Sequence, residues 1–282
     1  MPVLTIKDLD LAINGKAILK DISFSLEKGK ITGLVGESGS GKSLTALSIM
    51  QLLPRGTTNS GEIEFNGIDI LTANEETLCD LRGDDIGMVF QEPMTALNPL
   101  KTIGDQVSEG IRIHAGVSQS EAEERAIAIL ARVGLPIDLF PLSRYPHELS
   151  GGQRQRVVIA IACAMKPKLL IADEPTTALD SLVAIQIMKL IKKIQKQNNL
   201  AVLLITHDLN IVRNNADHIC VMKDGAILEC NTTEQIFQKP QHEYTKFLIT
   251  SEPKRSVKAI KNAQPVIELN GLSVRVPKKL GI

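Results

Sequence analysis

The segment Gly36–Ser43 has the residue types and the spacing of a phosphate-binding loop. Its sequence, GESGSGKS, matches the pattern GxxxxGK(S/T) and lies between the apolar stretch ITGLV and a stretch of helical composition. Glycines let backbone N–H groups turn inward around phosphate oxygens, and a helix N-terminus adds partial positive charge. Lys42 would pair with the β- and γ-phosphates, and Ser43 would offer its hydroxyl to Mg²⁺. The sequence therefore predicts a nucleoside triphosphate site made by Gly36, Glu37, Ser38, Gly39, Ser40, Gly41, Lys42 and Ser43.

Two acidic residues, Asp173 and Glu174, follow the apolar stretch KLLIA. The carboxyl ends of parallel strands are where open α/β sheets bind their ligands. Asp173 would hold Mg²⁺ directly or through water, and Glu174 would polarise the attacking water as a general base. A solvated strand end is the plainer interpretation of such a pair, and the phosphate loop in the same chain favours the catalytic one.

Two more polar residues follow predicted strands. His207 comes directly after AVLLIT, and we expect it to sense the γ-phosphate as a third strand end that converges on the site. Gln91 follows IGMVF and would ligate the metal or orient the water. Taken alone, either residue is equally typical of an ordinary loop.

The alternation of apolar stretches with turns and helical patterns predicts an α/β core. Strands are expected at 4–13, 18–26, 31–36, 61–65, 86–90, 168–174 and 201–207. The last two are continuously apolar, as in parallel strands buried on both faces. Helices are expected at 43–53, at 181–197 and in a mostly helical insertion at about 92–154, where Ser118 or Ser120 would cap one helix.

The segment Leu149–Gln153, LSGGQ, opens a helix that continues as RQRVVIAIACAM. Its small residues give a second N-terminus able to bind an anion, here without a lysine. The order of the phosphate loop, Gln91, LSGGQ, Asp173-Glu174-Pro, TALD and His207 resembles the ATP-binding cassette family over about residues 2–250. Within that family, FQEPMTALNPL and KPQHEYTKFLITSEP are similar to segments of the peptide and nickel importer ATPases.

The resemblance implies both a fold and a site shared between two cassettes. The fold would be a P-loop NTPase core with a mostly parallel central sheet, an N-terminal antiparallel β subdomain and an inserted α-helical subdomain. Such cassettes pair head to tail around ATP, and Asp180 would communicate between their two sites. The residues that would complete the partner cassette's site are Leu149, Ser150, Gly151, Gly152 and Gln153.

The resemblance also implies that ATP hydrolysis powers uptake of peptides or a related small solute. Two transmembrane permease subunits would dock in the groove beside Gln91, and an extracytoplasmic solute-binding protein would act through them. The chain would lie on the cytoplasmic face of a bacterial plasma membrane. Where the family often stacks an aromatic ring on adenine, alignment places Ile13, so we expect a weaker stacking contribution.

A segment near the end of the chain resembles the segment at its beginning. Residues 1–252 would form one nucleotide-binding domain, and residues 253–264 are polar and basic, as in a linker. The segment PVIELNGLSVRV at 265–276 then resembles PVLTIKDLDLAI at 2–13. Two short strands can match by chance. The alternative is a second, truncated cassette at 265–282, as in the fused importer ATPases.

Composition restricts the remaining classes of function. The chain has 282 residues with 32 Lys plus Arg against 32 Asp plus Glu, and this zero net charge argues against a nucleic-acid-binding protein. The longest apolar run, Val157–Met165, is far shorter than the ~20 residues that cross a bilayer. The N-terminus lacks the features of a secretory signal. The 4 scattered cysteines predict neither a disulfide framework nor a zinc site, in keeping with a reducing cytosol.

An alternative is a soluble cassette ATPase of a non-transport type, such as a DNA-repair or translation factor. The stretch between Lys42 and Ser150 is too short for the coiled-coil arms of chromosome-organising cassettes. Translation factors are expected to carry arginine-rich segments. A regulatory module without turnover would lack Glu174, which is present here.

Overall fold

The computed structural model describes residues 2–251 and 270–273, with the side chains of Pro93 and Met94 excepted. The chain divides into two units, Met1–Thr250 and Ser251–Ile282, and the fold below is that of the first. The predicted linker at 253–264 and most of the predicted second cassette at 265–282 lie outside the described residues.

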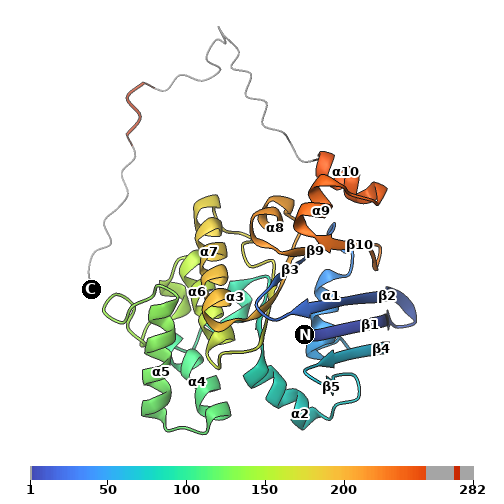
Figure 1. Cartoon of the computed structure of the whole chain (residues 1–282). Coiled ribbons are helices and arrows are strands. Elements are labelled where there is room, and N and C mark those ends of the chain that lie inside the picture. Colours follow the sequence, from blue (N-terminus) through green and yellow to red (C-terminus); the bar gives the residue numbers. More distant parts are fainter. Residues whose placement is uncertain (1, 252–269, 274–282) are drawn as a thin grey trace. The chain divides into compact units, whose positions relative to one another are not determined.

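The described elements alternate between strands and helices (Figure 1). In chain order they are β1 Pro2–Ile13, β2 Lys16–Glu27, β3 Ile31–Val35, α1 Lys42–Met50, β4 Thr57–Phe65, β5 Ile68–Asp69, α2 Glu75–Asp80, the π-helical turn η1 Leu81–Asp85, β6 Ile86–Val89, α3 Pro93–Ala96, α4 Ile103–Ala115, α5 Gln119–Arg132, the 3₁₀ turn η2 Pro146–Glu148, α6 Gly151–Cys163, β7 Leu169–Asp173, α7 Ser181–Asn198, β8 Ala201–Thr206, α8 Leu209–Asn215, β9 His218–Lys223, β10 Ala226–Thr232, α9 Thr233–Gln238 and α10 Glu243–Ser251.

The central sheet has six strands in the order β10-β9-β3-β8-β7-β6. The pairs from β9 to β6 are parallel, and β10 joins the edge antiparallel to β9. All residues of β3, β7 and β8 are buried. The expected α/β fold with a mostly parallel central sheet is therefore confirmed.

Apolar side chains cover the central sheet on both faces. Successive strand residues point to opposite faces, so Leu170 and Leu204 pack into one core while Leu169 and Leu203 pack into another. The first core lies against the helices α4 to α8. The second contains the four-stranded antiparallel sheet β2-β1-β4-β5 and helix α1. Figure 1 shows α4 and α5 as an adjacent pair, well away from this antiparallel sheet.

Side-chain caps define where several helices begin. Ser118 accepts a hydrogen bond from the Glu121 amide and caps α5, which decides between the two predicted caps. Helix α1 begins at Lys42 and ends at Met50, earlier than predicted, because Gln51 adopts a left-handed conformation with φ 47°.

The structure corrects the prediction for the cysteines. Cys220 on β9 lies directly opposite Cys230 on β10, with Cα atoms 4.0 Å apart, and the two form a disulfide. The sequence analysis predicted no strands after residue 207, so it could not place these two residues across a hairpin. Cys79 and Cys163 are free thiols, and burial raises the pKa of Cys163 to about 12, as suits a core residue.

Within the described residues, no helix is both long and apolar enough to cross a membrane.

Truncation of Leu203 tests the double-sided burial of the sheet. This side chain is 0% exposed in β8, so we expect Leu203→Ala to lower the free energy of unfolding by about 2–5 kcal/mol. Leu182 on α7 is 73% exposed, and Leu182→Ala should change stability by less than about 0.5 kcal/mol. Denaturant unfolding of both variants measures the difference, and equal losses would contradict the packing described here.

Candidate functional site

The phosphate loop connects β3 to α1 and rests against neighbouring strands. A Cβ at Gly36 would collide with the Met222 carbonyl oxygen, and one at Gly41, where φ is +106°, would lie 2.6 Å from Leu19. At Gly39, with φ +81°, the space is open. One side of the loop is therefore packed on β2 and β9, while the other is free to receive a ligand.

Lys42 folds back onto the loop. It is 5% exposed, and its Nζ donates to the carbonyl oxygens of Gly36 at 2.9 Å and Glu37 at 2.8 Å. Burial lowers the pKa of Lys42, and the nearby carboxylates of Glu174 and Asp173 oppose that shift. The loop thus holds a buried cation on its own backbone carbonyls.

Asp173 ends β7 beside the first residues of α1. Burial is the largest influence on its carboxyl and raises the pKa, while the neighbouring Ser43 side chain and Lys42 lower it. Its Oδ1 atom is buried and has no hydrogen-bond partner among the described residues. An unpartnered carboxylate oxygen next to a hydroxyl is a donor set of the type that Mg²⁺ prefers, so these residues fit a magnesium ion.

Three strand ends meet at Glu174, which follows β7. Because β6, β7 and β8 are adjacent and parallel, the residues after them lie at one edge of the sheet. His207 Nδ1 lies 3.0 Å from Glu174 Oε1, and Gln91 Nε2 donates to Oε2 at 3.2 Å. The structure therefore brings together Glu174, His207 and Gln91, the three residues predicted to be catalytic.

Thr177 is a member of this cluster to which the sequence analysis gave no role. Its hydroxyl donates to Glu174 Oε2 at 2.8 Å, and its amide donates to the Glu174 carbonyl at 3.1 Å in the same turn. The clue in the sequence was that Thr177 follows Glu174 by three residues within DEPTT, a spacing at which a turn brings two side chains together. This turn also holds Glu174 at φ 46°, an unusual conformation for a non-glycine residue.

Opposing influences set the charge of Glu174. Burial is the largest single influence and would raise the pKa, but hydrogen bonds from His207 and Thr177 outweigh it and leave the pKa below its ordinary value. Since the folded-state pKa is depressed, the ionised carboxylate stabilises the fold above the unfolded-state value, and that contribution is lost as pH falls through the folded-state pKa.

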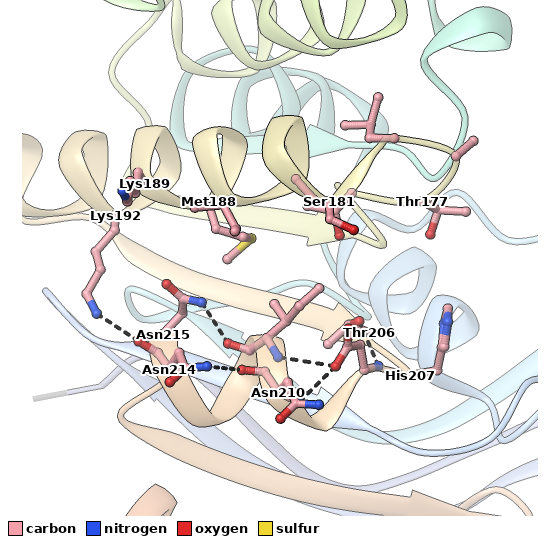
Figure 2. Close-up of a pocket in the computed structure, with 17 residues that line it drawn as sticks. Thr177, Ser181, Met188, Lys189, Lys192, Thr206, His207, Asn210, Asn214 and Asn215 are labelled. Atoms are coloured by element: carbon pink, nitrogen blue, oxygen red, sulfur yellow. Dashed lines mark hydrogen bonds between the residues drawn. The ribbon is translucent and has the colours of Figure 1, made fainter. Parts of the chain in front are cut away.

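A cavity of about 850 Å³ opens beside this cluster, between α7 and α8. Figure 2 shows Thr177 and His207 at one end and Lys189 and Lys192 at the other. The Thr206 hydroxyl accepts a hydrogen bond from the Asp208 amide at 3.1 Å. This bond joins the residues before and after His207 and so fixes the backbone that carries it. His207 itself is 61% exposed, so its ring borders open space.

The LSGGQ segment forms the N-terminus of α6. Ser150 caps the helix: its Oγ accepts from the Gln153 amide at 3.3 Å, and Gln153 Oε1 accepts from the Ser150 amide at 2.8 Å. Leu149 is buried, whereas Ser150 and Gly151 are exposed. A Cβ at Gly152 would lie 2.5 Å from Val183, so the helix start needs a glycine where it meets α7.

Asp180 and Ile13 lie outside the cluster around Glu174. Asp180 caps α7, with Oδ1 accepting from the amides of Leu182 and Val183. Ile13 is half-buried at the end of β1. The next strand of the same hairpin, β2, contacts the phosphate loop through Leu19.

The Thr177 contact gives a direct test of the cluster. In Thr177→Val the hydroxyl that stabilises the ionised carboxylate is lost, so the pKa of Glu174 should rise. Carbon-13 NMR of the Glu174 carboxyl, followed through an acid titration, measures this pKa. Thr176→Val is the matched control and should leave the pKa of Glu174 unchanged. An equal rise in both variants would show that the Thr177 hydroxyl is not its cause.

Comparison with known proteins places the chain among transport ATP-binding proteins. Its residues 19–177 match the family model described as "ABC transporter". It is 47% identical to the peptidoglycan transport ATP-binding protein YejF of Agrobacterium fabrum, over 100% of this chain and 53% of that protein. It is 46% identical to the oligopeptide transport ATP-binding protein OppD of Bacillus subtilis, over 86% of this chain and 70% of that protein. The chain thus spans about half the length of the first relative.

Solved structures agree with this placement. The cassette cbiO1 of Clostridium perfringens superimposes with a TM-score of 0.74 at 31% identity, covering 84% of this chain and 91% of that one. The dimeric cassette MJ0796, solved with ADP and Pi, gives a TM-score of 0.72 at 31% identity, covering 82% and 98%. The chain therefore belongs to the ABC transporter family.

Proposed function

We propose that this chain is the ATP-hydrolysing subunit of an importer that takes up peptides or a related small solute through a membrane permease. The observation that carries the proposal is the meeting of Gln91, Glu174 and His207 at the edge of the sheet that also holds Lys42 and Asp173. A buried cation, a carboxylate with an unpartnered oxygen and a hydrogen-bonded base are the groups that phosphoryl transfer to water requires.

Binding begins at the phosphate loop. The β- and γ-phosphates would replace the Gly36 and Glu37 carbonyls as partners of Lys42, which is buried and therefore interacts strongly with a phosphate. Amides of the loop and of α1 would donate to the remaining oxygens. Ile13 would cover the adenine as an aliphatic surface.

Ser43, Asp173 and Gln91 would hold Mg²⁺, which when bound neutralises the charge on the phosphates and orients them. The Ser43 side chain is close enough to lower the pKa of the Asp173 carboxyl, so two of these ligands are neighbours. The buried Oδ1 of Asp173 would gain the partner that it otherwise lacks.

Glu174 would polarise the water that attacks the γ-phosphate. Hydrogen bonds from His207 and Thr177, together with the nearby His207 and Lys42 charges, offset burial and keep the pKa of its carboxyl below the ordinary value, so it is ionised at neutral pH. Gln91 and Thr177 both bond to Oε2 and so fix the direction of the carboxylate. His207 is on Oε1, and contact with the γ-phosphate would draw its exposed ring away from Glu174, which is how it would sense the bound nucleotide.

A second cassette would complete each site. The exposed N-terminus of α6 at Ser150 and Gly151 offers amides to an anion outside its own phosphate loop. The relative MJ0796 was solved as a dimer. We infer that two cassettes pair head to tail here, with Asp180 next to the junction and ATP as the ligand whose binding favours the closed pair.

The names of the relatives support a class of cargo for this chain. The names of several relatives refer to peptidoglycan, oligopeptide or glutathione transport. We propose a peptide-type solute, two permease subunits, a solute-binding protein outside the cell and a position on the cytoplasmic face of a bacterial plasma membrane. In the full-length protein the second cassette would be the other half of the same polypeptide, since the Agrobacterium relative is about twice as long as its matched region. In the 282-residue chain alone, a second copy would take that place as a homodimer.

Replacement of Glu174 tests the catalytic assignment. Glu174→Gln keeps the size and hydrogen-bonding reach of the side chain but removes the base, so kcat should fall by about 10²–10⁴-fold while ATP still binds. Steady-state phosphate release and equilibrium binding of MgATP measure the two effects, and ATP should trap a dimer detectable by light scattering. The exposed Glu76→Gln is the control. Undiminished hydrolysis in Glu174→Gln would refute the role of Glu174.

Mixing two inactive variants tests the shared site. Lys42→Ala disables the phosphate loop, and Gly151→Asp places a carboxylate at the N-terminus of α6. Each alone should hydrolyse little ATP. In an equal mixture, about half of the dimers contain one copy of each variant, and one of the two sites in such a dimer has both parts intact. Turnover should therefore recover to about a quarter of the wild-type value. Activity in the mixture no greater than the sum of the separate variants would contradict a shared site.

A further inference from the structure

The cavity between α7 and α8 has the size of a small-molecule site. Its volume of about 850 Å³ lies within the range of about 300–1,000 Å³ that is usual for ligand pockets. Its lining comes from the turn after β7, helix α7, the residues after β8 and helix α8 (Figure 2). Lys42, Ser43 and Asp173 do not line it, whereas His207 and Thr177 do. The cavity is therefore distinct from the phosphate loop and shares two residues with the cluster around the catalytic carboxylate.

The middle of the cavity is lined by apolar side chains. Helix α7 contributes Ala184, Ile185 and Met188, and α8 contributes Ile211. Met188 is 4% exposed and is part of the wall, whereas Ile185 is 52% exposed. A ligand that covers these side chains removes apolar surface from water, which contributes about 25 cal/mol per Å².

The two ends of the cavity carry opposite charges. Lys189 and Lys192 line one end, where Lys192 Nζ donates to a backbone carbonyl of α8 at 3.2 Å (Figure 2). Asp208 lines the other end, next to His207, and caps α8 with its Oδ1 atom. Among the described residues, neither lysine nor Asp208 takes part in an ion pair. The cavity thus offers two ammonium groups at one end and a carboxylate at the other.

Helix geometry sets the distance between these ends. Since an α-helix rises about 1.5 Å per residue, Ser181, on the side of His207, and Lys192 lie about 16 Å apart along α7. An extended peptide advances about 3.3–3.6 Å per residue, so about four residues span this distance. A peptide of that length carries one positive and one negative end, separated by side chains that can be apolar.

We propose that the cavity between α7 and α8 binds a short peptide with free termini, about four residues long and apolar in its middle. Its carboxylate lies at Lys189 and Lys192, its ammonium lies at Asp208, and its side chains pack on Met188 and Ile211. Exposed ion pairs contribute little free energy, so the apolar contacts supply most of the affinity and the charged ends set the direction of the chain.

A bound peptide acts on ATP hydrolysis through His207. The His207 ring borders the cavity with its side chain 61% exposed, and its Nδ1 lies 3.0 Å from Glu174 Oε1. Under the proposed function, on which this step rests, His207 leaves Glu174 to contact the γ-phosphate. A peptide that fills the space beside the ring favours the arrangement in which His207 stays on Glu174, and it therefore lowers turnover. The cassette is thereby inhibited by the class of solute that it is proposed to take up.

Calorimetry with the 282-residue chain and the tetrapeptide Ala-Leu-Leu-Ala tests the site without nucleotide. We expect saturable binding that weakens by about 2- to 5-fold when either terminus is blocked, by acetylation or by amidation. Lys189→Gln should weaken binding of the free peptide by a similar factor and that of the amidated peptide much less. Lys193→Gln is the matched control, because Lys193 is exposed on the same helix but outside the lining, and it should bind as wild type does.

A larger side chain inside the cavity tests where the peptide lies. Ala184→Phe occupies part of the space and should raise the Kd for the peptide by at least about 10-fold. An unchanged Kd for MgATP shows that this variant is folded. In wild type, saturating peptide should lower the kcat of ATP hydrolysis by at least about 3-fold and leave KM for MgATP within about 2-fold.

The outcomes separate this inference from the proposed function. Absence of binding, or binding that is indifferent to both blocked termini and to Lys189→Gln, would overturn the inference. So would Ala184→Phe that still binds peptide but no longer forms the ATP-trapped dimer in the Glu174→Gln background, because the cavity would then belong to the second cassette. Binding without a change in kcat would overturn the regulatory step. Wild-type protein that binds peptide but hydrolyses no ATP would overturn the proposed function and leave the peptide site standing.

Discussion

Because both faces of the six-stranded sheet pack against apolar cores, a strand that slipped by one residue would exchange the side chains it presents to the two cores and disturb the close packing of both. This constraint fixes the register of β6, β7 and β8, and with it the positions of the residues that follow them. Gln91, Glu174 and His207 come from distant parts of the sequence, yet they lie within hydrogen-bonding distance. The precision of the site is therefore a property of the buried sheet rather than of the loops that carry the functional groups.

The charges at the site balance one another before any ligand arrives. Lys42 is buried among carbonyl oxygens, with the carboxylates of Asp173 and Glu174 near enough to oppose the lowering of its pKa. Asp173 has a raised pKa and Glu174 a lowered one, although they are adjacent in sequence. The difference follows from hydrogen bonding: Glu174 gains bonds from His207 and Thr177 that outweigh burial, whereas burial dominates at Asp173. Two neighbouring carboxyl groups thereby suit two roles, one as a metal ligand and one as a base.

The loop that holds Lys42 is supported by segments from several parts of the chain. Leu19 of β2, Met222 of β9 and the Gly225 turn contact it directly. The LSGGQ segment, by contrast, presents exposed amides at the N-terminus of α6. One nucleotide site is thus rigidly supported on the side of its own cassette, and we propose that it is completed by residues of another.

Glycine spacing, apolar runs and helix caps act over a few residues, so the local strand–loop–helix units could be predicted from the amino-acid sequence. Gly36–Ser43, the acids after β7 and Ser150 at the start of α6 were identified in this way. Which residues meet across long separations follows instead from the packing of the whole domain. The bonds of Gln91 and His207 to Glu174 depend on it, since they join residues 83 and 33 positions apart in the sequence. No local pattern encodes these contacts, since each arises from the packing of elements that are joined only through the common core.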